Sequence, residues 1–209
     1  MALRAVVFDY GMVLSGPQDP EAYAVLLRIT GLPKERFESF YWADRHAYDE
    51  GKLTGLEFWR KLLHDAGLAL GDGAVEELNH WDIRMWSTLN LPMIAWHQQL
   101  RARGLKTAIL SNMGDSVHES IVMEFSWIQN FDVLVWSYQL RVAKPEPAIY
   151  LHTLDKLGTK PEETLFIDDR RVNTDAARVL GMRAIEFATV ERLRKDLIAN
   201  SLDLELPLP

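Results

Sequence analysis

Cysteine is absent from this chain of 209 residues. Its absence excludes disulfide bonds, zinc sites built on thiolates and cysteine nucleophiles. The chain also lacks an excess of basic residues, because 30 acidic side chains outweigh 23 lysines and arginines and give a formal charge of −7. Nonspecific nucleic-acid binding needs a basic surface, so this charge argues against DNA or RNA as a partner.

Long apolar runs are missing as well, since no stretch approaches the roughly 18 residues that span a membrane. The apolar run at residues 5–8 is too short for the core of a signal peptide. We therefore expect a cytoplasmic protein with no membrane partner. Hydrophobic residues make up 48% of the chain and charged residues 25%, a composition typical of a globular protein.

Short runs rich in Val, Ile, Leu and Phe predict five buried strands, at residues 4–9, 106–110, 132–136, 164–168 and 183–187. Helical patterns alternate with them at 92–103, 115–125, 145–157, 171–180 and 190–199. Pro92 and Pro145 suit first-turn positions, and Gly104, Gly158 and Gly181 suit positions just after a helix. This alternation predicts an α/β fold with a parallel sheet covered on both faces.

One connection is much longer than a crossover requires, because residues 16–91 separate the first strand from the helix that leads to the second. This stretch contains helical patterns of its own, at 21–29, 34–48, 55–66 and 74–86. We therefore expect two domains. Residues 1–15 and 92–209 would form the core domain, and residues 16–91 would form a helical cap.

Polar residues follow the predicted strands at their carboxyl ends, where open parallel sheets bind ligands. They are Asp9, Ser111, Asn112, Asp168 and Asp169, with Lys144 in the loop after the third strand. Taken alone, each has an ordinary explanation, since aspartate, serine and asparagine favour turns and helix caps. Their joint occurrence at one edge of a sheet favours a site.

The chemistry of that site follows from the residue types. Asp9, Asp168 and Asp169 would repel one another unless a divalent cation lay among them, and oxygen ligands favour Mg²⁺. Lys144 and the hydroxyl of Ser111 would bind an anionic phosphoryl group. Asp9 is then a candidate nucleophile on phosphorus.

As a set, the motifs resemble the haloacid dehalogenase-like superfamily: Phe8-Asp9-Tyr10-Gly11-Met12-Val13-Leu14, Leu110-Ser111-Asn112, Ala143-Lys144-Pro145-Glu146, and Phe166-Ile167-Asp168-Asp169 with Asn173. Within it, Ser-Asn and Lys-Pro-Glu-Pro-Ala-Ile-Tyr look most like the bacterial α-D-glucose-1-phosphate phosphatases and the N-terminal phosphatase domain of soluble epoxide hydrolases. The resemblance implies a Rossmann-like core with an inserted α-helical cap of the C1 type.

The resemblance also implies roles for the strand-end residues. Asp9 would attack phosphorus to form an aspartyl-phosphate that water hydrolyses. Mg²⁺ would be held by Asp9, the carbonyl of Gly11 and Asp169, with Asp168 supporting it through water. The phosphoryl oxygens would be bound by Ser111 and Asn112, while Lys144 would fix both nucleophile and phosphate and Asn173 would brace the metal loop.

Gly11 departs from the family pattern, in which most phosphatases carry a second aspartate as general acid and base two residues after the nucleophile. Losing such a proton donor costs about 10²–10⁴-fold on an unactivated ester. Three explanations stay open: a substrate with a better leaving group, such as a sugar 1-phosphate; a donor from the cap or from water; or a slow enzyme.

Two residues of the expected cap, Arg45 and His46, are candidates for substrate contacts. They share a helical stretch with Tyr41, Trp42 and Tyr48, in which positions three and four apart lie on one face. A packed aromatic stripe explains those three aromatic residues equally well.

The sequence therefore predicts a magnesium-dependent phosphatase acting on a small phosphorylated metabolite, with sugar phosphates, and sugar 1-phosphates in particular, as the expected substrates. A metal-independent 2-haloacid dehalogenase is the first alternative, although such enzymes carry tyrosine at the position of Gly11. A ligand-binding protein that has lost turnover is the second. Both a monomer and a homodimer are compatible with the sequence.

Overall fold

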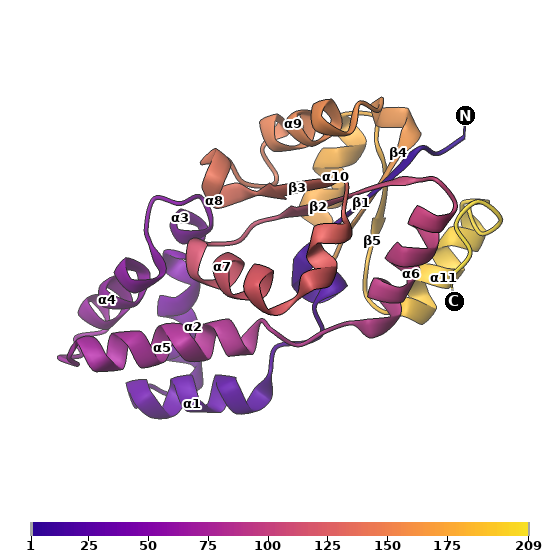
Figure 1. Cartoon of the computed structure of the whole chain (residues 1–209). Coiled ribbons are helices and arrows are strands. Elements are labelled where there is room, and N and C mark those ends of the chain that lie inside the picture. The colour runs from indigo at the N-terminus through magenta and orange to yellow at the C-terminus, as the bar shows by residue number, and fades with distance from the viewer. Residues whose placement is uncertain (1, 209) are drawn as a thin grey trace.

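The computed structural model describes residues 2–208 and is built around a parallel sheet of five strands (Figure 1). The strand order is β3-β2-β1-β4-β5, and every neighbouring pair is parallel. The strands are β1 (Ala5–Phe8), β2 (Lys106–Ser111), β3 (Val133–Trp136), β4 (Thr164–Asp168) and β5 (Arg183–Glu186). All five predicted strands are present within one residue of their predicted ends, which confirms the α/β fold.

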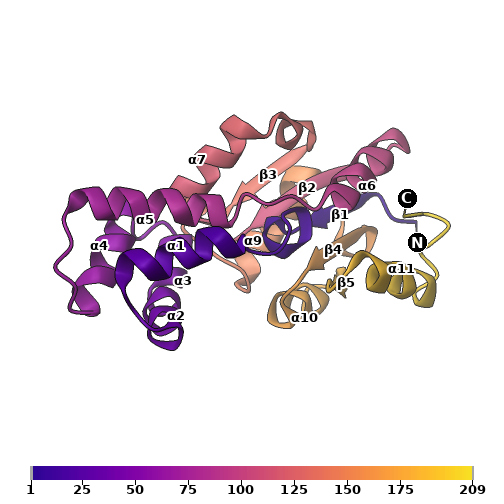
Figure 2. The same cartoon turned by 90° about the horizontal axis from the view of Figure 1, so that it is seen from below.

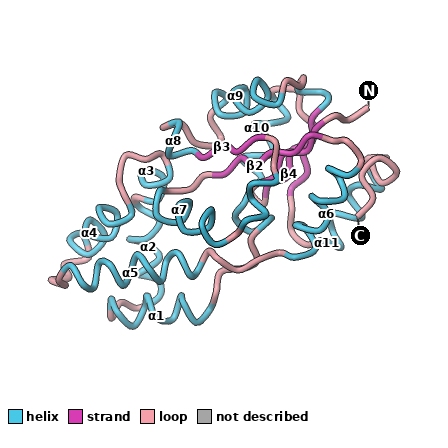
Figure 3. Tube along the Cα trace, in the orientation of Figure 1, coloured by secondary structure: helices cyan, strands magenta, loops and turns pink. Residues whose placement is uncertain are grey.

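Helices cover both faces of the sheet (Figure 3). Successive residues of a strand point to opposite faces, so Val6 and Phe8 of β1 pack into one apolar cluster. Ala5 and Val7 pack into another. The first cluster includes α6 (Leu91–Ala102), α7 (Asp115–Glu124) and α11 (Val190–Ala199), and the second includes α9 (Pro147–Leu157) and α10 (Arg171–Val179).

The helix after Lys144 begins later than predicted, so the placement of Pro145 in its first turn was wrong. Helix α9 begins at Pro147, and Pro145 precedes it in a cis peptide bond with Lys144. Glu146 is extended, with φ −62° and ψ 132°. A residue that precedes proline is kept out of the α region, and this steric restriction explains the later start.

Residues 34–48 form two helices, whereas the sequence predicts one. They are α2 (Lys34–Ala43) and α3 (Arg45–Asp49), separated at Asp44 with φ −111° and ψ 5°. The break lies where buried ion pairs of Arg45 begin, with Asp49 in α3 and with Asp82. The pair with Asp82 is a tertiary contact, and contacts of this kind can override the local tendency to continue a helix.

The inserted helices lie together beside the sheet (Figures 1 and 2). They are α2, α3, α1 (Pro20–Thr30), α4 (Gly55–Asp65) and α5 (Asp72–Met85), and they share an apolar cluster that contains Phe58 and Trp59. The chain enters and leaves this group at one place. Ser15 pairs with Leu89 in an isolated antiparallel bridge, and the Asn90 N–H donates to the carbonyl of Leu14 (2.9 Å).

The inserted helices contact the segments that follow the carboxyl ends of β2 and β3 closely. The Gly55 N–H donates to Asp115 at the start of α7 (2.9 Å). The ring of Tyr48 lies so near the α-carbon of Gly114 that a β-carbon there would clash with it. Gly51, at φ 70°, faces the carbonyl of Tyr138 in α8 (Ser137–Leu140) in the same way. These contacts hold the helices over the strand ends.

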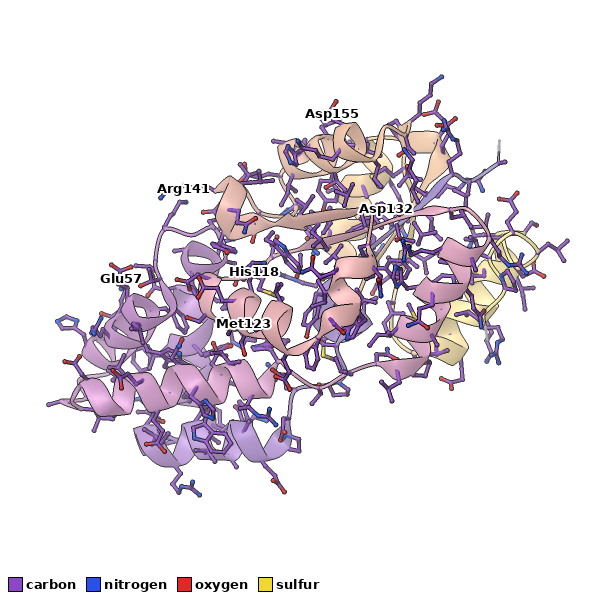
Figure 4. The ribbon with its side chains drawn as sticks, viewed as in Figure 1. Glu57, His118, Met123, Asp132, Arg141 and Asp155 are labelled. Carbon is purple, nitrogen blue, oxygen red and sulfur yellow. The ribbon has the colours of Figure 1, made fainter. Side chains whose placement is uncertain are left out.

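The amino ends of the strands lie away from the inserted helices. Asp132, labelled in Figure 4, accepts a hydrogen bond from the Thr107 N–H at the start of β2 (2.7 Å). Two short 3₁₀ turns, Ser126–Asn130 and Pro161–Glu163, complete the connections. Between residues 2 and 208, no helix has both the length and the apolar character needed to cross a membrane.

Candidate active site

Lys144 is the centre of a buried polar group at the carboxyl ends of the strands, with 2% of its surface exposed. Its Nζ lies 3.0 Å from Asp9, directly after β1, and 2.6 Å from Asp168, the last residue of β4. It also donates to the carbonyl of Leu110 (2.9 Å). The sheet therefore brings together residues far apart in sequence, as the strand-end pattern predicts.

Three carboxylates share this edge, and oxygens of Asp9, Asp168 and Asp169 lie within 4.8 Å of one another. Burial raises the pKa of Asp9 to about 8, with the other two carboxylates acting in the same direction and Lys144 opposing them. Burial and Asp168 also raise the pKa of Asp169. One lysine does not balance the negative charge of three carboxylates. The carboxylate oxygens are the kind of ligand that a hard divalent cation prefers.

Asp168 is fixed by its neighbours. Asn173 Nδ2 donates to both of its carboxylate oxygens (2.9 and 3.1 Å), and the Arg170 N–H donates to Oδ1 (2.8 Å). The carbonyl of Asn173 in turn accepts a hydrogen bond from the Tyr150 hydroxyl (3.0 Å). With both oxygens already bonded, Asp168 is suited to hold the loop rather than to bind a metal directly, and Asn173 is placed to brace it.

Asn112 has a structural contact that the sequence does not suggest. Its Oδ1 accepts from the Lys144 N–H (2.7 Å), and its Nδ2 donates to the Lys144 carbonyl (2.8 Å). One N–H of Nδ2 and the oxygen Oδ1 thus bind the Lys144 backbone, and the side chain still lines the cavity with a second N–H, so phosphate binding by Asn112 stays a prediction. Ser111, at the end of β2, lines the same cavity as Asn112.

A cavity of about 380 Å³ lies between the strand ends and the inserted helices. Its core side includes Asp9, Gly11, Ser111, Lys144 and Asp169, and its helical side includes Trp42, Arg45, Asp49 and Trp86. A cavity that joins convergent polar groups to apolar walls is typical of a small-molecule site.

Arg45 is the centre of a second buried polar group, on the helical side of the cavity. Its Nε lies 3.0 Å from Asp49, and its Nη1 lies 3.4 Å from Asp82. The Tyr41 hydroxyl donates to Asp82 (2.7 Å), contacts Arg45 and accepts from the Trp86 indole N–H (3.0 Å). Burial raises the pKa of both aspartates, against the opposing effect of Arg45.

The family model described as haloacid dehalogenase-like hydrolase matches residues 3–181. The chain belongs to this family. The bifunctional epoxide hydrolase 2 of Rattus norvegicus is 35% identical over the whole chain, but the chain spans only 41% of its length. A phosphatase of Mycobacterium tuberculosis is 30% identical, with 88% of this chain and 87% of the relative covered.

Solved structures of haloacid dehalogenase-like enzymes share the fold. A family enzyme of Bacteroides thetaiotaomicron superposes with a TM-score of 0.76 at 20% identity, covering 94% of this chain and 99% of the other. The L-2-haloacid dehalogenase of Xanthobacter autotrophicus superposes with a TM-score of 0.65 at 22% identity, covering 96% and 84%. These likenesses show the fold alone, so the chemistry must be argued from the site.

The two predicted cap residues differ in position within this haloacid dehalogenase-like hydrolase. Arg45 lines the cavity, whereas His46 is exposed, is not among the lining residues and lies 3.2 Å from Glu50. Sequence analysis missed Asp49 as a residue of the cavity. Its spacing of four from Arg45 within one helix was the available signal.

Gly11 shows where the family aspartate would lie. A β-carbon at this position would be 3.9 Å from a ring carbon of Trp86, with no closer neighbour outside the local chain. A side chain at residue 11 would therefore point into the space between the core and the inserted helices. Because Gly11 has no side chain, this space is part of the cavity, and the inserted helices line it on the other side.

Proposed function

We propose that this protein is a magnesium-dependent phosphatase that hydrolyses a small phosphorylated metabolite. The observation that carries the proposal is the placement of Lys144 between Asp9 and Asp168, with Asp169 beside them, at one end of the cavity. In such an arrangement Asp9 would be the nucleophile, Lys144 a fixed cation and the carboxylates metal ligands around one point.

Each residue would have a defined task. An oxygen of Asp9 would attack phosphorus and form an aspartyl-phosphate, and water would then release phosphate. Lys144 would keep Asp9 oriented and offset the charge of the phosphoryl oxygens, with Ser111 donating a hydrogen bond. Magnesium, held by Asp9, Asp169 and the Gly11 carbonyl with Asp168 behind them, would supply further positive charge where the reaction concentrates negative charge.

Residues 16–91 would act as a cap domain over a core of residues 1–15 and 92–209. The separate apolar cluster of the inserted helices and their contacts at Gly51, Gly55 and Gly114 support this division. A cap over the strand ends would exclude water and select the leaving group.

The helical wall of the cavity favours a neutral leaving group. The charge of Arg45 is already offset by Asp49 and Asp82, so a second anionic group on the substrate would meet no free cation from this wall. Trp42 and Trp86 add flat apolar faces. We therefore propose sugar phosphates, and sugar 1-phosphates in particular, as substrates rather than phosphorylated acids.

Two relatives support the reaction type. The M. tuberculosis protein is named as a phosphatase and is covered over most of its length. The B. thetaiotaomicron enzyme also has a structure with magnesium and inorganic phosphate, at a TM-score of 0.73 and 20% identity. Neither relative identifies the substrate of this chain.

The test is phosphate release from sugar phosphates, phosphorylated acids and an aryl phosphate, with magnesium and with a chelator. We expect magnesium-dependent release that favours sugar phosphates and falls by at least ~10⁴-fold in Asp9→Asn, as for loss of a nucleophile. A folded protein that releases no phosphate from the panel would contradict the proposal. Metal-independent halide release from a 2-haloacid would instead establish a dehalogenase.

A further inference from the structure

The cavity lacks a proton donor at the position where the family usually has one, because Gly11 has no side chain. When the P–O bond to a sugar or alcohol breaks, the departing oxygen carries negative charge unless a nearby acid protonates it. The donor must face the cavity from the side opposite to Asp9, since attack and departure are in line. The helical wall lies on that side of the cavity.

Among the described residues that line the cavity, three carry carboxyl groups: Asp9, Asp49 and Asp169. Asp9 is the nucleophile of the proposed reaction, and Asp169 belongs to the metal ligands. Asp49 is therefore the one carboxyl group of this lining to which the proposed attack and metal binding assign no part. On this basis, which rests on the proposed phosphatase function, we propose that Asp49 is the general acid and base that replaces the missing aspartate.

The contacts of Asp49 suit this role. Arg45 Nε binds Oδ1 at 3.0 Å, which leaves Oδ2 as the oxygen available to a ligand. The Asp49 side chain is largely buried, at 14% exposed. Burial raises the pKa of Asp49 above its ordinary value, with Asp82 of α5 acting in the same direction and Arg45 and His46 of α3 opposing. Arg45 also stabilises the carboxylate that remains once the proton has left.

The backbone of Asp49 is attached to the catalytic edge of the sheet. Its carbonyl accepts a hydrogen bond from the Ser137 hydroxyl, and the same hydroxyl oxygen accepts from the Met113 N–H (2.9 Å). Met113 follows Ser111 by two residues, so one serine joins the proposed acid to the proposed phosphate-binding segment. This connection fixes Asp49 relative to the strand ends although it belongs to an inserted helix.

The proposed reaction has two steps. An oxygen of Asp9 forms a bond to phosphorus while the bond to the leaving oxygen breaks, and that oxygen takes the proton of the Asp49 carboxyl. Water then attacks the aspartyl-phosphate and gives its proton to the Asp49 carboxylate. The P–O bond to Asp9 breaks in this step, and both aspartates return to their starting states.

The experiment compares esters whose leaving groups differ in their need for a proton. We would measure kcat/KM for 4-nitrophenyl phosphate and for phenyl phosphate, with magnesium, in the wild-type protein and in Asp49→Asn. A general acid matters little for 4-nitrophenolate and much for phenolate. We expect a loss of about 10²-fold or more for phenyl phosphate and less than about tenfold for 4-nitrophenyl phosphate.

Asp82→Asn is the matched control, because Asp82 also pairs with Arg45 but does not line the cavity. It should change kcat/KM for both esters by the same factor, while Asp49→Glu should recover part of the phenyl phosphate activity. Equal losses on both esters in Asp49→Asn, or no loss on either, would overturn the assignment.

If Asp49→Asn does not fold, the wild-type protein still decides the question. Across a series of substituted phenyl phosphates, an enzyme with a general acid shows a shallow dependence of kcat/KM on the leaving group. A steep dependence would contradict the role of Asp49 while leaving the phosphatase intact. Absence of turnover on every ester would instead remove the proposed function and this inference together.

Discussion

At the strand ends Lys144 is buried between Asp9 and Asp168, and in the inserted helices Arg45 is buried between Asp49 and Asp82. The two groups use the same pairing of one cation with two carboxylates. They differ because the strand-end group has a third carboxylate in Asp169, within 4.8 Å of its neighbours. Similar buried ion pairs would thus serve the proposed metal site in one region and the proposed proton donor in the other.

The largest expected effect comes from removing each central cation. Lys144→Met and Arg45→Met each leave two buried carboxylates uncompensated, so each should lower the free energy of unfolding by about 3–5 kcal/mol. Turnover of 4-nitrophenyl phosphate should fall by about 10³-fold for Lys144→Met and by much less for Arg45→Met, because only Lys144 contacts the nucleophile. Urea unfolding and kcat/KM measure the two effects, and equal activity losses would break the distinction.

Magnesium should distinguish the two groups next. At 100 times its dissociation constant, a cation that binds only the folded protein stabilises it by about 2.7 kcal/mol. We expect a gain of this size in wild-type protein and in Asp82→Asn, measured as the magnesium-dependent shift of the urea midpoint. Asp169→Asn should lose most of it. If the stabilisation by magnesium were lost in Asp82→Asn, the ion would bind near Arg45, and the proposed metal site at the strand ends would be wrong.

Asn112 tests how strictly Lys144 must be held. Asn112→Ala removes both hydrogen bonds to the Lys144 backbone, and each buried group left unpaired costs about 1–3 kcal/mol. We expect an unfolding free energy lower by about 2 kcal/mol and a fall in kcat of about tenfold, with KM changed little, because Lys144 is displaced from the nucleophile. A rise in KM alone would indicate instead that Asn112 binds phosphate directly.

His97 provides a smaller contrast, as a titratable side chain that is buried without charge. It stacks on Phe131, with ring centroids 3.6 Å apart, and burial lowers its pKa to about 4. The unfolded chain binds the proton more readily below pH 6.5, so this histidine destabilises the fold as pH falls. At pH 5 the loss should be about 2 kcal/mol.

Urea unfolding at pH 7 and pH 5 measures this loss. In His97→Gln the difference between the two pH values should be smaller by about 2 kcal/mol, since glutamine does not titrate. Asp132 raises the pKa of His97, against the effect of burial, so it should be kept unchanged in both proteins. An unchanged difference in the variant would assign the acid sensitivity to other groups.

The sequence predicted the sheet and the gathering of residues at its edge because both depend on local signals. Continuous apolar runs mark buried parallel strands, and the carboxyl ends of such strands meet at one edge of the sheet, where Asp9 and Asp168 follow. The contact of Asn112 with the Lys144 backbone was outside this reasoning. It depends on how two loops meet, and the amide of asparagine suits a phosphate and a peptide group equally well.

The helical wall of the cavity was harder to predict because its contacts, too, join segments that are distant in the sequence. Asp82 is separated from Arg45 by a whole helix and a loop, so no spacing in the sequence relates them. The break at Asp44 was also missed, because residues 34–48 have no proline or glycine to end a helix. Such features depend on packing between helices, which single-sequence patterns do not encode.

The bridge between Ser15 and Leu89 brings the start and the end of the insertion side by side. A segment whose two ends meet can lengthen, shorten or be exchanged over generations without changing the connectivity of the strands that flank it. Natural selection can thus alter the helical wall of the cavity while the aspartates and lysine of the sheet stay as they are. For this family, new substrates and an inherited reaction can evolve at separate rates within one chain.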